Sequence, residues 1–431
     1  MTGQATAADH LLSQAFAAFA SEPSGSGAMW LDQRRERALR NFRLAGIPHR
    51  RVEEWKYTDL RAALDAPQEP ALADHAPGPL RDPFAAITGP RLVMNDGCFD
   101  WARSKADSCQ AGIDVFDLAT AGEMTPDWVK RNFGEVLAAG AMEQASLALM
   151  RGGLAMRVAA PSTIPVHLHF LHGASAVHGR VLIVVEEGAS LVLLESHGGH
   201  SGISNLGMEI VLKPHAQMTH LRLAEAAPDA VQIEVVGIRV GRDARYQGHF
   251  SQKGARLSRL ELWIWLHDKG AEAELSGASV LSGRLHADVT TRIDHVAGNT
   301  GSRQLFKHVA GGNSRTVYQG KITVRKGANG SDSRQTAKAL LLGARAEADL
   351  KPELEILADD VKCAHGAAVG DLDADSLFYL RSRGLGEGEA RSLLVRAFLQ
   401  DAVAEVARED ARAAIWDFVE SGLVEALGAQ A

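Results

Sequence analysis

The middle of the chain, from about residue 150 to about residue 365, alternates hydrophobic and polar positions in short runs separated by tight turns. The segment Lys321-Ile322-Thr323-Val324-Arg325 alternates strictly, and residues 220–223 do the same. A period of two places apolar side chains on one face of an extended segment and polar side chains on the other. The pattern therefore predicts a series of short β-strands.

The turns between these strands recur at a regular spacing. Successive turns are 27, 28, 27, 29 and 28 residues apart when they are aligned on Ala189, Ala216, Ala244, Ala271, Thr300 and Ala328. A period of this size without helical patterning is typical of a β-solenoid, in which each repeat forms one coil of two or three strands. The sequence predicts a mainly β protein, built on a right-handed parallel β-helix with regular coils from about residue 150.

Helical periodicity characterises both ends of the chain. Residues 9–20 and 30–47 predict two amphipathic helices, the second ending at Gly46, and residues 66–90 resemble a linker. After Asp371 we expect a short capped helix and then two longer ones, with apolar stripes at Leu394, Phe398, Ala402 and Val406 and at Ile415, Trp416, Val419 and Leu423. We therefore divide the chain into an N-terminal helical domain with its linker (1–90), a β-helix core with a mixed opening segment (91–370) and a C-terminal helical domain (371–431).

Composition excludes several functional classes. The 431 residues carry a net charge of -7 and a pI of 6.2, which argues against nucleic acid as a partner. No apolar run is long enough to predict a membrane helix, and the first residues lack a secretory signal pattern. Three cysteines cannot build a disulfide framework and suit a reducing compartment. We expect a cytoplasmic protein.

Histidines and tryptophans in the chain suggest sites that we interpret as packing or surface positions. His167 and His169 share one strand face, with His172 close by, and we expect them to point outward without binding metal. Trp263 and Trp265 also share a face and predict an aromatic layer. Trp55, with Tyr57, is expected to pack the N-terminal helices onto the next unit. We interpret Cys98 and Cys109 as small hydrophobic residues.

The segment from Lys351 to Gly384 contains the strongest candidate for chemistry. Leu354 and Ile356 begin it with strand alternation, and Cys363 and His365 follow two residues apart. On a strand these two side chains share a face. They could bind a soft or borderline metal, pair as thiolate and imidazolium, or simply pack. Two ligands alone do not complete a metal site.

Two motifs resemble those of the SufB/SufD family of iron–sulfur cluster assembly proteins. The first is KPELEILADDVKCAHGAAVGDLDADSLFYLRSRGL at 351–385, and the second is EEWKYTDL at 53–60. The resemblance implies a non-catalytic scaffold of the SufBCD complex, which pairs with SufB and which binds the ATPase SufC through its C-terminal helices. The chain has no Walker A motif, so ATP would have to be bound by another subunit.

Within that family the chain resembles the SufD group more than the SufB group. Where SufB proteins carry an assembly cysteine, residues 329–335 contain no thiol, and Cys363-Ala364-His365 stands where SufB tends to have HEA. The resemblance places Cys363 and His365 at the SufB interface as ligands of a nascent cluster shared with the partner, with His365 favoured. It implies no cofactor held stably by this chain alone, only a transient iron–sulfur cluster in the complex, and it leaves open whether reduced flavin binds.

Two alternatives remain at this stage. One is a SufB-type assembly scaffold. The other, from a different class, is a carbohydrate-active β-helix enzyme, which would need two placed carboxylates such as Asp288 and Asp294. The cytosolic composition and the helices at both ends argue against the enzyme.

Overall fold

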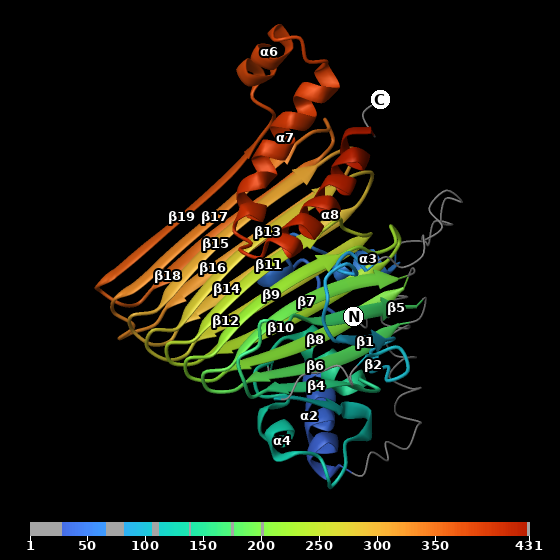
Figure 1. The fold of residues 1–431 in the computed structure, drawn as a ribbon, viewed down its shortest axis with the longest axis vertical. Helices are drawn as coiled ribbons and strands as arrows, with labels where there is room; N and C mark the ends of the chain where they lie inside the picture. Colours follow the sequence, from blue (N-terminus) through green and yellow to red (C-terminus); the bar gives the residue numbers. More distant parts are fainter. Residues whose placement is uncertain are drawn as a thin grey trace, which may run out of the picture.

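A computed structural model describes residues 28–65, 82–105, 112–137, 139–173, 176–199 and 202–428. The helix expected at 9–20, most of the expected linker and Cys109 lie outside these residues. In the described part the chain is mainly β, with a β-solenoid of about eight turns and helices at both ends (Figure 1). The predicted fold class is confirmed.

Strands alternate between two sheets as the chain advances, so each coil contributes one strand to each sheet. Sheet A has the order β19-β17-β15-β13-β11-β9-β7-β5-β1-β2. Its strands are β1 Arg91–Asn95, β2 Cys98–Phe99, β5 Val166–His172, β7 Ser190–Gly199, β9 Gln217–Ala224, β11 Arg245–Gln252, β13 Glu272–Leu281, β15 Gly301–Ala310, β17 Ser331–Leu341 and β19 Val361–Gly370.

Sheet B runs alongside in the order β18-β16-β14-β12-β10-β8-β6-β4-β3. Neighbouring strands are parallel except at the β1–β2 and β3–β4 pairs. The strands of sheet B are β3 Ile113–Asp117, β4 Gly153–Val158, β6 Val177–Val185, β8 Ile203–Leu212, β10 Val231–Val240, β12 Leu257–Leu266, β14 His286–His295, β16 Arg315–Val324 and β18 Glu347–Ile356.

The predicted coil spacing agrees with the strand register up to Thr300. Register offsets are 27 for Ser190↔Gln217, 28 for Gln217↔Arg245, 27 for Arg245↔Glu272 and 29 for Glu272↔Gly301. The last predicted spacing, Thr300 to Ala328, is wrong. Gly301 pairs with Asp332, so Ser331 is the true equivalent of Thr300.

A wider turn causes that shift. Gly327 and Gly330 both have positive φ, and together they lengthen the connection between β16 and β17. The hydroxyls of Thr300 and Ser331 lie 3.0 Å apart, which fixes the new stacking. Turn composition alone did not reveal the added residues.

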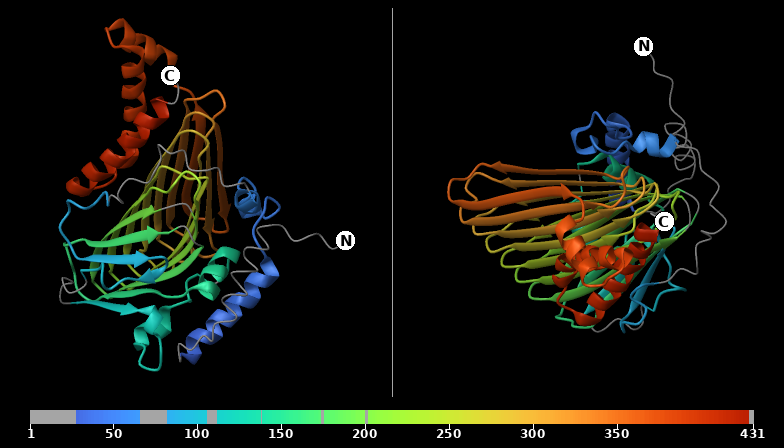
Figure 2. Two further views of the ribbon diagram at one scale, coloured as in Figure 1. Left: turned by 90° about the vertical axis from the view of Figure 1, so that its right-hand side faces the viewer. Right: turned by 90° about the horizontal axis from the view of Figure 1, so that it is seen from above.

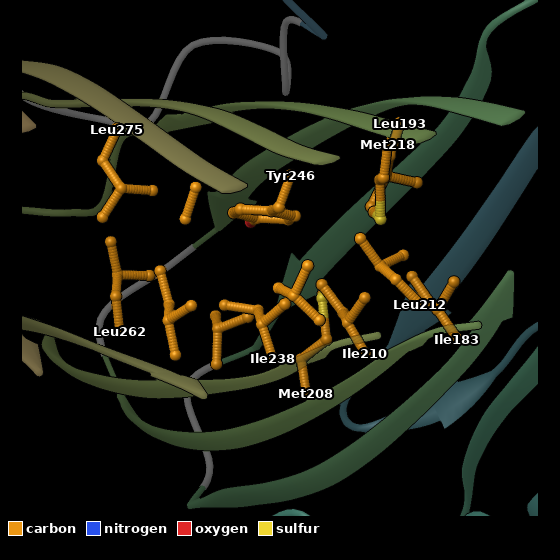
Figure 3. Close-up of a cluster of buried hydrophobic side chains, with 14 of the residues drawn as sticks. Ile183, Leu193, Met208, Ile210, Leu212, Met218, Ile238, Tyr246, Leu262 and Leu275 are labelled. Atoms are coloured by element: carbon orange, nitrogen blue, oxygen red, sulfur yellow. The ribbon is translucent and has the colours of Figure 1, made fainter. Parts of the chain in front are cut away.

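The core fills the space between the two sheets, which we call the lumen. Figure 3 shows Ile210, Ile238 and Leu262 of sheet B facing Tyr246 and Leu275 of sheet A. Equivalent positions of successive coils stack on one another, which is why the alternation recurs in each coil. Truncating one of these buried Leu or Ile side chains to Ala would cost about 2–5 kcal/mol.

Helices cover the outer faces of both sheets, on opposite sides of the solenoid (Figure 2). α5 (Ala141–Leu149) packs on sheet B and carries α2 (Met29–Ala45), which ends before Gly46 as predicted. α7 (Glu387–Ala404) and α8 (Glu409–Gly428) pack on strands β9 to β15 of sheet A. The other helices are α3 Leu60–Asp65, α4 Asp127–Asn132 and α6 Ala374–Ser382, with short 3-10 turns at Glu53–Trp55 and Leu118–Thr120.

The C-terminal helices bury slightly different residues from those predicted. In α7 the buried side chains include Val395, Leu399 and Val403, whereas Leu394 and Phe398 are only partly buried. The prediction is therefore confirmed at Ala402 and Val406, whereas earlier in α7 the buried positions follow the predicted ones by one residue. The α8 stripe is confirmed at Ile415, Val419 and Leu423, with Trp416 at its edge.

The prediction of solvent-facing positions for His167 and His169 is wrong. Both point away from the lumen, but both are buried. His169 Nδ1 lies 2.7 Å from the Ser196 hydroxyl, which in turn donates to Asp82. The segment that contains Asp82 covers this face of sheet A, a long-range contact that strand alternation cannot reveal.

Candidate functional site

β18 and β19 form an open end of the solenoid. They are the last strands of sheets B and A, and among the described residues each pairs with one neighbouring strand of its sheet (Figure 1). Most residues of β19 are exposed, unlike those of the inner strands. An edge strand leaves backbone N–H and C=O groups free to pair with another chain.

Cys363 and His365 share one face of β19, as predicted. Cys363 stacks on Ser333 of β17 and His365 on Gln335, which continues the lumen-facing side of the sheet. Cys363 is partly buried against the core, whereas His365 is exposed. The imidazole therefore reaches solvent at the open end, and the thiol lies beside it at the rim of the lumen.

The surroundings of Cys363 keep its sulfur protonated. Partial burial, together with the negative charge of Asp332, raises the pKa of the Cys363 thiol. The thiolate is the form that binds metal, so a cation or a partner group must favour it. The side chain of His365, in contrast, is exposed to solvent.

A polar layer lies beneath this pair. Ser333 and Ser302 hydroxyls are 2.8 Å apart, and Gln335 Nε2 donates to the Tyr318 hydroxyl at 2.9 Å. Gln335 Oε1 is buried and makes no hydrogen bond to any described residue. The column of polar side chains leads from the edge into the lumen.

The two motifs that carried the family resemblance meet in space. Lys351 of β18 binds Glu53 at 2.6 Å, although 298 positions separate them in the chain. Arg292 binds Glu54 at 2.8 Å, and Gln319 donates to the Glu54 carbonyl. The segment around Trp55 therefore crosses β14, β16 and β18 on the outer face of sheet B and ties the last coils together.

Trp55 and Thr58 anchor that segment on buried charges. The Arg259 guanidinium lies 4.0 Å from the Trp55 ring centre and also binds Asp288, to which Thr58 donates. The expected packing role of Trp55 is confirmed. Sequence reasoning missed Arg259, because a charged residue on a strand predicts a solvent-facing position.

The carbohydrate-active enzyme considered above would use the carboxylates of Asp288 and Asp294, but both are already in ion pairs with arginines. Asp288 is fully buried under Thr58 and paired with Arg259, and Asp294 is paired with Arg325. A glycosidase needs one carboxylate to protonate the leaving group and a second to act on the sugar. Asp288 is inaccessible to a saccharide, so this pair cannot perform that chemistry.

The C-terminal helices present an apolar surface to solvent. α6 has no buried residue, and Asp373 caps it by accepting from the Ser376 N–H. Phe378 is 74% exposed and Tyr379 55% exposed, and Leu393 of α7 is also exposed. Figure 1 shows α6 beyond the strand layers, at the end where β17 and β19 lie.

Trp263 and Trp265 pack together as predicted, with ring centres 6.3 Å apart. They lie on the outer face of sheet B against Leu137 and its neighbours, not in the lumen. Within the described part of the chain, no helix combines the length and apolarity needed to span a membrane.

Comparison with known proteins agrees with this architecture. Residues 169–398 match the SufBD core domain of the SUF system for iron–sulfur cluster assembly, and residues 12–79 match the SufBD protein N-terminal region. The chain is 31% identical over 376 residues to an iron–sulfur cluster assembly SufBD family protein of Synechocystis, covering 82% of each chain. The chain belongs to the SufBD family of iron–sulfur cluster assembly proteins.

Within that family the similarity extends to a named member. The chain is 29% identical over 370 residues to the iron–sulfur cluster assembly protein SufD of Escherichia coli, covering 84% of this chain and 85% of that protein. The predicted resemblance to SufD is confirmed.

Proposed function

We propose that this chain is the SufD-type scaffold subunit of a SufBCD complex and that it does not itself catalyse a reaction. The open end formed by β18 and β19 pairs with a SufB-type subunit, and Cys363 and His365 contribute to a nascent cluster site shared across that interface. The observation that carries the proposal is the position of this thiol and imidazole on one face of β19, the terminal strand of sheet A.

His365 is the favoured ligand. Its imidazole is exposed, and a neutral imidazole binds iron well. Cys363 is partly buried, and its raised thiol pKa makes it the weaker candidate, so its role is to support the site. Neither residue completes a tetrahedral set, which is why the partner must supply the remaining ligands.

The test changes each residue separately, as His365→Ala and Cys363→Ser, and measures both heterodimer assembly with the SufB-type subunit and iron and sulfide content after reconstitution. We expect His365→Ala to lose most of the cluster while assembly is retained, and Cys363→Ser to lose less. Normal cluster content in both variants would refute a ligand role. Loss of assembly would indicate that the residues only pack at the interface.

The exposed surface of α6 and α7 supports a second contact, with a SufC-type ATPase. Phe378, Tyr379 and Leu393 are large exposed apolar side chains on these helices, and the Arg383 guanidinium lies 5.1 Å from the Tyr379 ring centre. Aromatic anchors of this kind are typical of interface hot spots. Because α7 and α8 cover a buried part of sheet A, point variants on α6 are a cleaner test than truncation of the helices.

We predict that the double change Phe378→Ala and Tyr379→Ala weakens ATPase binding by at least about tenfold, since a hot-spot aromatic contributes about 2 kcal/mol or more. Binding is measured by titration calorimetry. The control is Met124→Ala, which removes another exposed apolar side chain, from a region outside the C-terminal helices. Equal affinity of both variants for the ATPase would place the docking surface elsewhere.

A further inference from the structure

A second polar cluster lies inside the lumen, several coils away from the open end. It forms where strands of sheet A end and the chain turns into sheet B, and we call it the seam cluster. Its members come from four sheet A strands and one sheet B strand: His172 of β5, Glu195 and His197 of β7, His220 and Arg222 of β9, Tyr246 of β11 and Glu234 of β10. All seven are buried.

Three of these side chains converge on one point. One ligand atom each of Glu195, His197 and Glu234 lies within 4.8 Å of the other two. His197 Nε2 contacts a Glu195 oxygen directly and lies 3.4 Å from Glu234 Oε2. One imidazole and two carboxylates form a donor set that suits Fe²⁺ or Zn²⁺.

Each of the two β7 donors is held by a further side chain. His220 Nε2 lies 2.6 Å from Glu195 Oε2, and its Nδ1 lies 2.8 Å from the Tyr246 hydroxyl. His197 Nδ1 lies 3.3 Å from His172 Nε2, and the His197 ring stacks on Phe170. Metal-binding histidines commonly donate their second N–H to such an acceptor, which fixes the ring and its tautomer.

Arg222 places a positive charge beside the carboxylates of Glu195 and Glu234. Its guanidinium binds Glu234 at 2.5 Å and lies 3.3 Å from Glu195 Oε1. The two carboxylates share this one arginine as their cationic partner. His172 Nδ1, also buried, makes no hydrogen bond to any described residue. A buried polar network with an unmatched imidazole nitrogen is costly unless a further group completes it.

We propose that Glu195, His197 and Glu234 form a binding site for a first-row divalent cation, Fe²⁺ or Zn²⁺, in the seam of the solenoid. Three protein ligands leave one coordination position open. The site has no thiol, so it takes a single ion and not an iron–sulfur cluster. It is independent of the proposed role of Cys363 and His365, because their strand β19 is separated from β7 by five strands of sheet A.

The experiment uses the full chain with His365→Ala and Cys363→Ser in place, so that the open end cannot contribute. After treatment with a chelator, the protein is titrated with Co²⁺, followed by visible absorption and calorimetry, and then with Zn²⁺ and anaerobic Fe²⁺ in competition. We expect one equivalent of Co²⁺ to bind in a site of low symmetry and to be displaced by Zn²⁺.

In the same background, Glu234→Gln and His197→Gln should each weaken Co²⁺ binding by more than about 100-fold, and His172→Gln by about 10–100-fold through loss of the outer support. The matched control is His249→Gln, because His249 is equally buried but contacts only Ser251 and Ser276 hydroxyls among described side chains. It should bind Co²⁺ like the parent. Circular dichroism and thermal melting establish that each variant is folded.

Absence of stoichiometric Co²⁺ binding by the folded parent would overturn the proposal. Unchanged affinity in Glu234→Gln or in His172→Gln would overturn it as well, since the seam cluster would then be only a packed network. If Glu234→Gln and His197→Gln fail to fold, the proposal is tested by the Co²⁺ titrations of the parent and of His172→Gln.

Discussion

His178, His249 and His308 illustrate how burial sets chemistry at the scale of single residues. All three are buried, and desolvation lowers the pKa of His178 and His308 to about 4 and that of His249 to about 3. Each lies within hydrogen-bond distance of a neighbouring hydroxyl or amide group, for example Thr316 beside His308. The unfolded chain protonates them near pH 6.5, so folding and proton binding are linked.

We predict that stability falls as the pH drops below about 6.5. Above that pH both the folded and unfolded states hold these histidines neutral, and their contribution is fully present. Below it the unfolded state takes up protons that the folded state excludes, which costs about 1.4 kcal/mol per pH unit for each histidine, or about 2 kcal/mol at pH 5. Urea unfolding at pH 7, 6 and 5 measures the effect.

The control for this prediction is a single variant. His249→Gln should reduce the pH dependence by about 1.4 kcal/mol per pH unit. Stability that is level between pH 7 and 5 in the parent would show that these imidazoles are not held neutral.

At the scale of elements, the segment Glu53–Trp55 and the residues after it act as a strap across sheet B. Trp55 is 5% exposed and packs with Phe42, Ile47 and Leu60 as well as on Arg259. The strap therefore joins the N-terminal helices to the last coils of the solenoid. Its sequence motif is explained by these contacts.

We predict that Trp55→Ala lowers the free energy of unfolding by about 3–5 kcal/mol, because it removes a buried aromatic side chain and uncovers the Arg259–Asp288 pair. Urea denaturation measures it. Trp101→Ala is the matched control, since Trp101 is 52% exposed and should cost much less. Equal losses in the two variants would mean that the strap contributes no special stability.

Much of the element structure could be predicted from the sequence because it depends on local periodicity. Strand alternation and turn spacing identified the solenoid, and the helix before Gly46 ended where expected. The stacking of Ser331 on Thr300 could not be predicted, because the added residues lie in a turn whose length is set by backbone conformation.

Less of the candidate sites could be predicted, since they depend on contacts between distant segments. The shared face of Cys363 and His365 follows from their spacing alone. The convergence of Glu195, His197 and Glu234 does not, because Glu234 lies on the facing sheet. No sequence pattern shows which polar strand positions point into the lumen until the register is known.

At the scale of the whole molecule, one end of the solenoid differs from the other. The early strands begin in antiparallel pairs, β1–β2 and β3–β4, and helices pack nearby. β18 and β19 instead leave the lumen rim, the edge backbone and His365 exposed at the other end. This asymmetry allows one specific end-to-end pairing and disfavours open-ended stacking of many copies.

The most direct test of the proposed scaffold role is amide hydrogen exchange of the chain alone and mixed with a SufB-type subunit. Our account predicts that exchange slows on binding across residues 347–370, where β18 and β19 gain backbone partners, while the inner strand β14 is protected in both samples. Unchanged exchange across 347–370, with new protection confined to another surface, would contradict the claim that the open end is the docking edge.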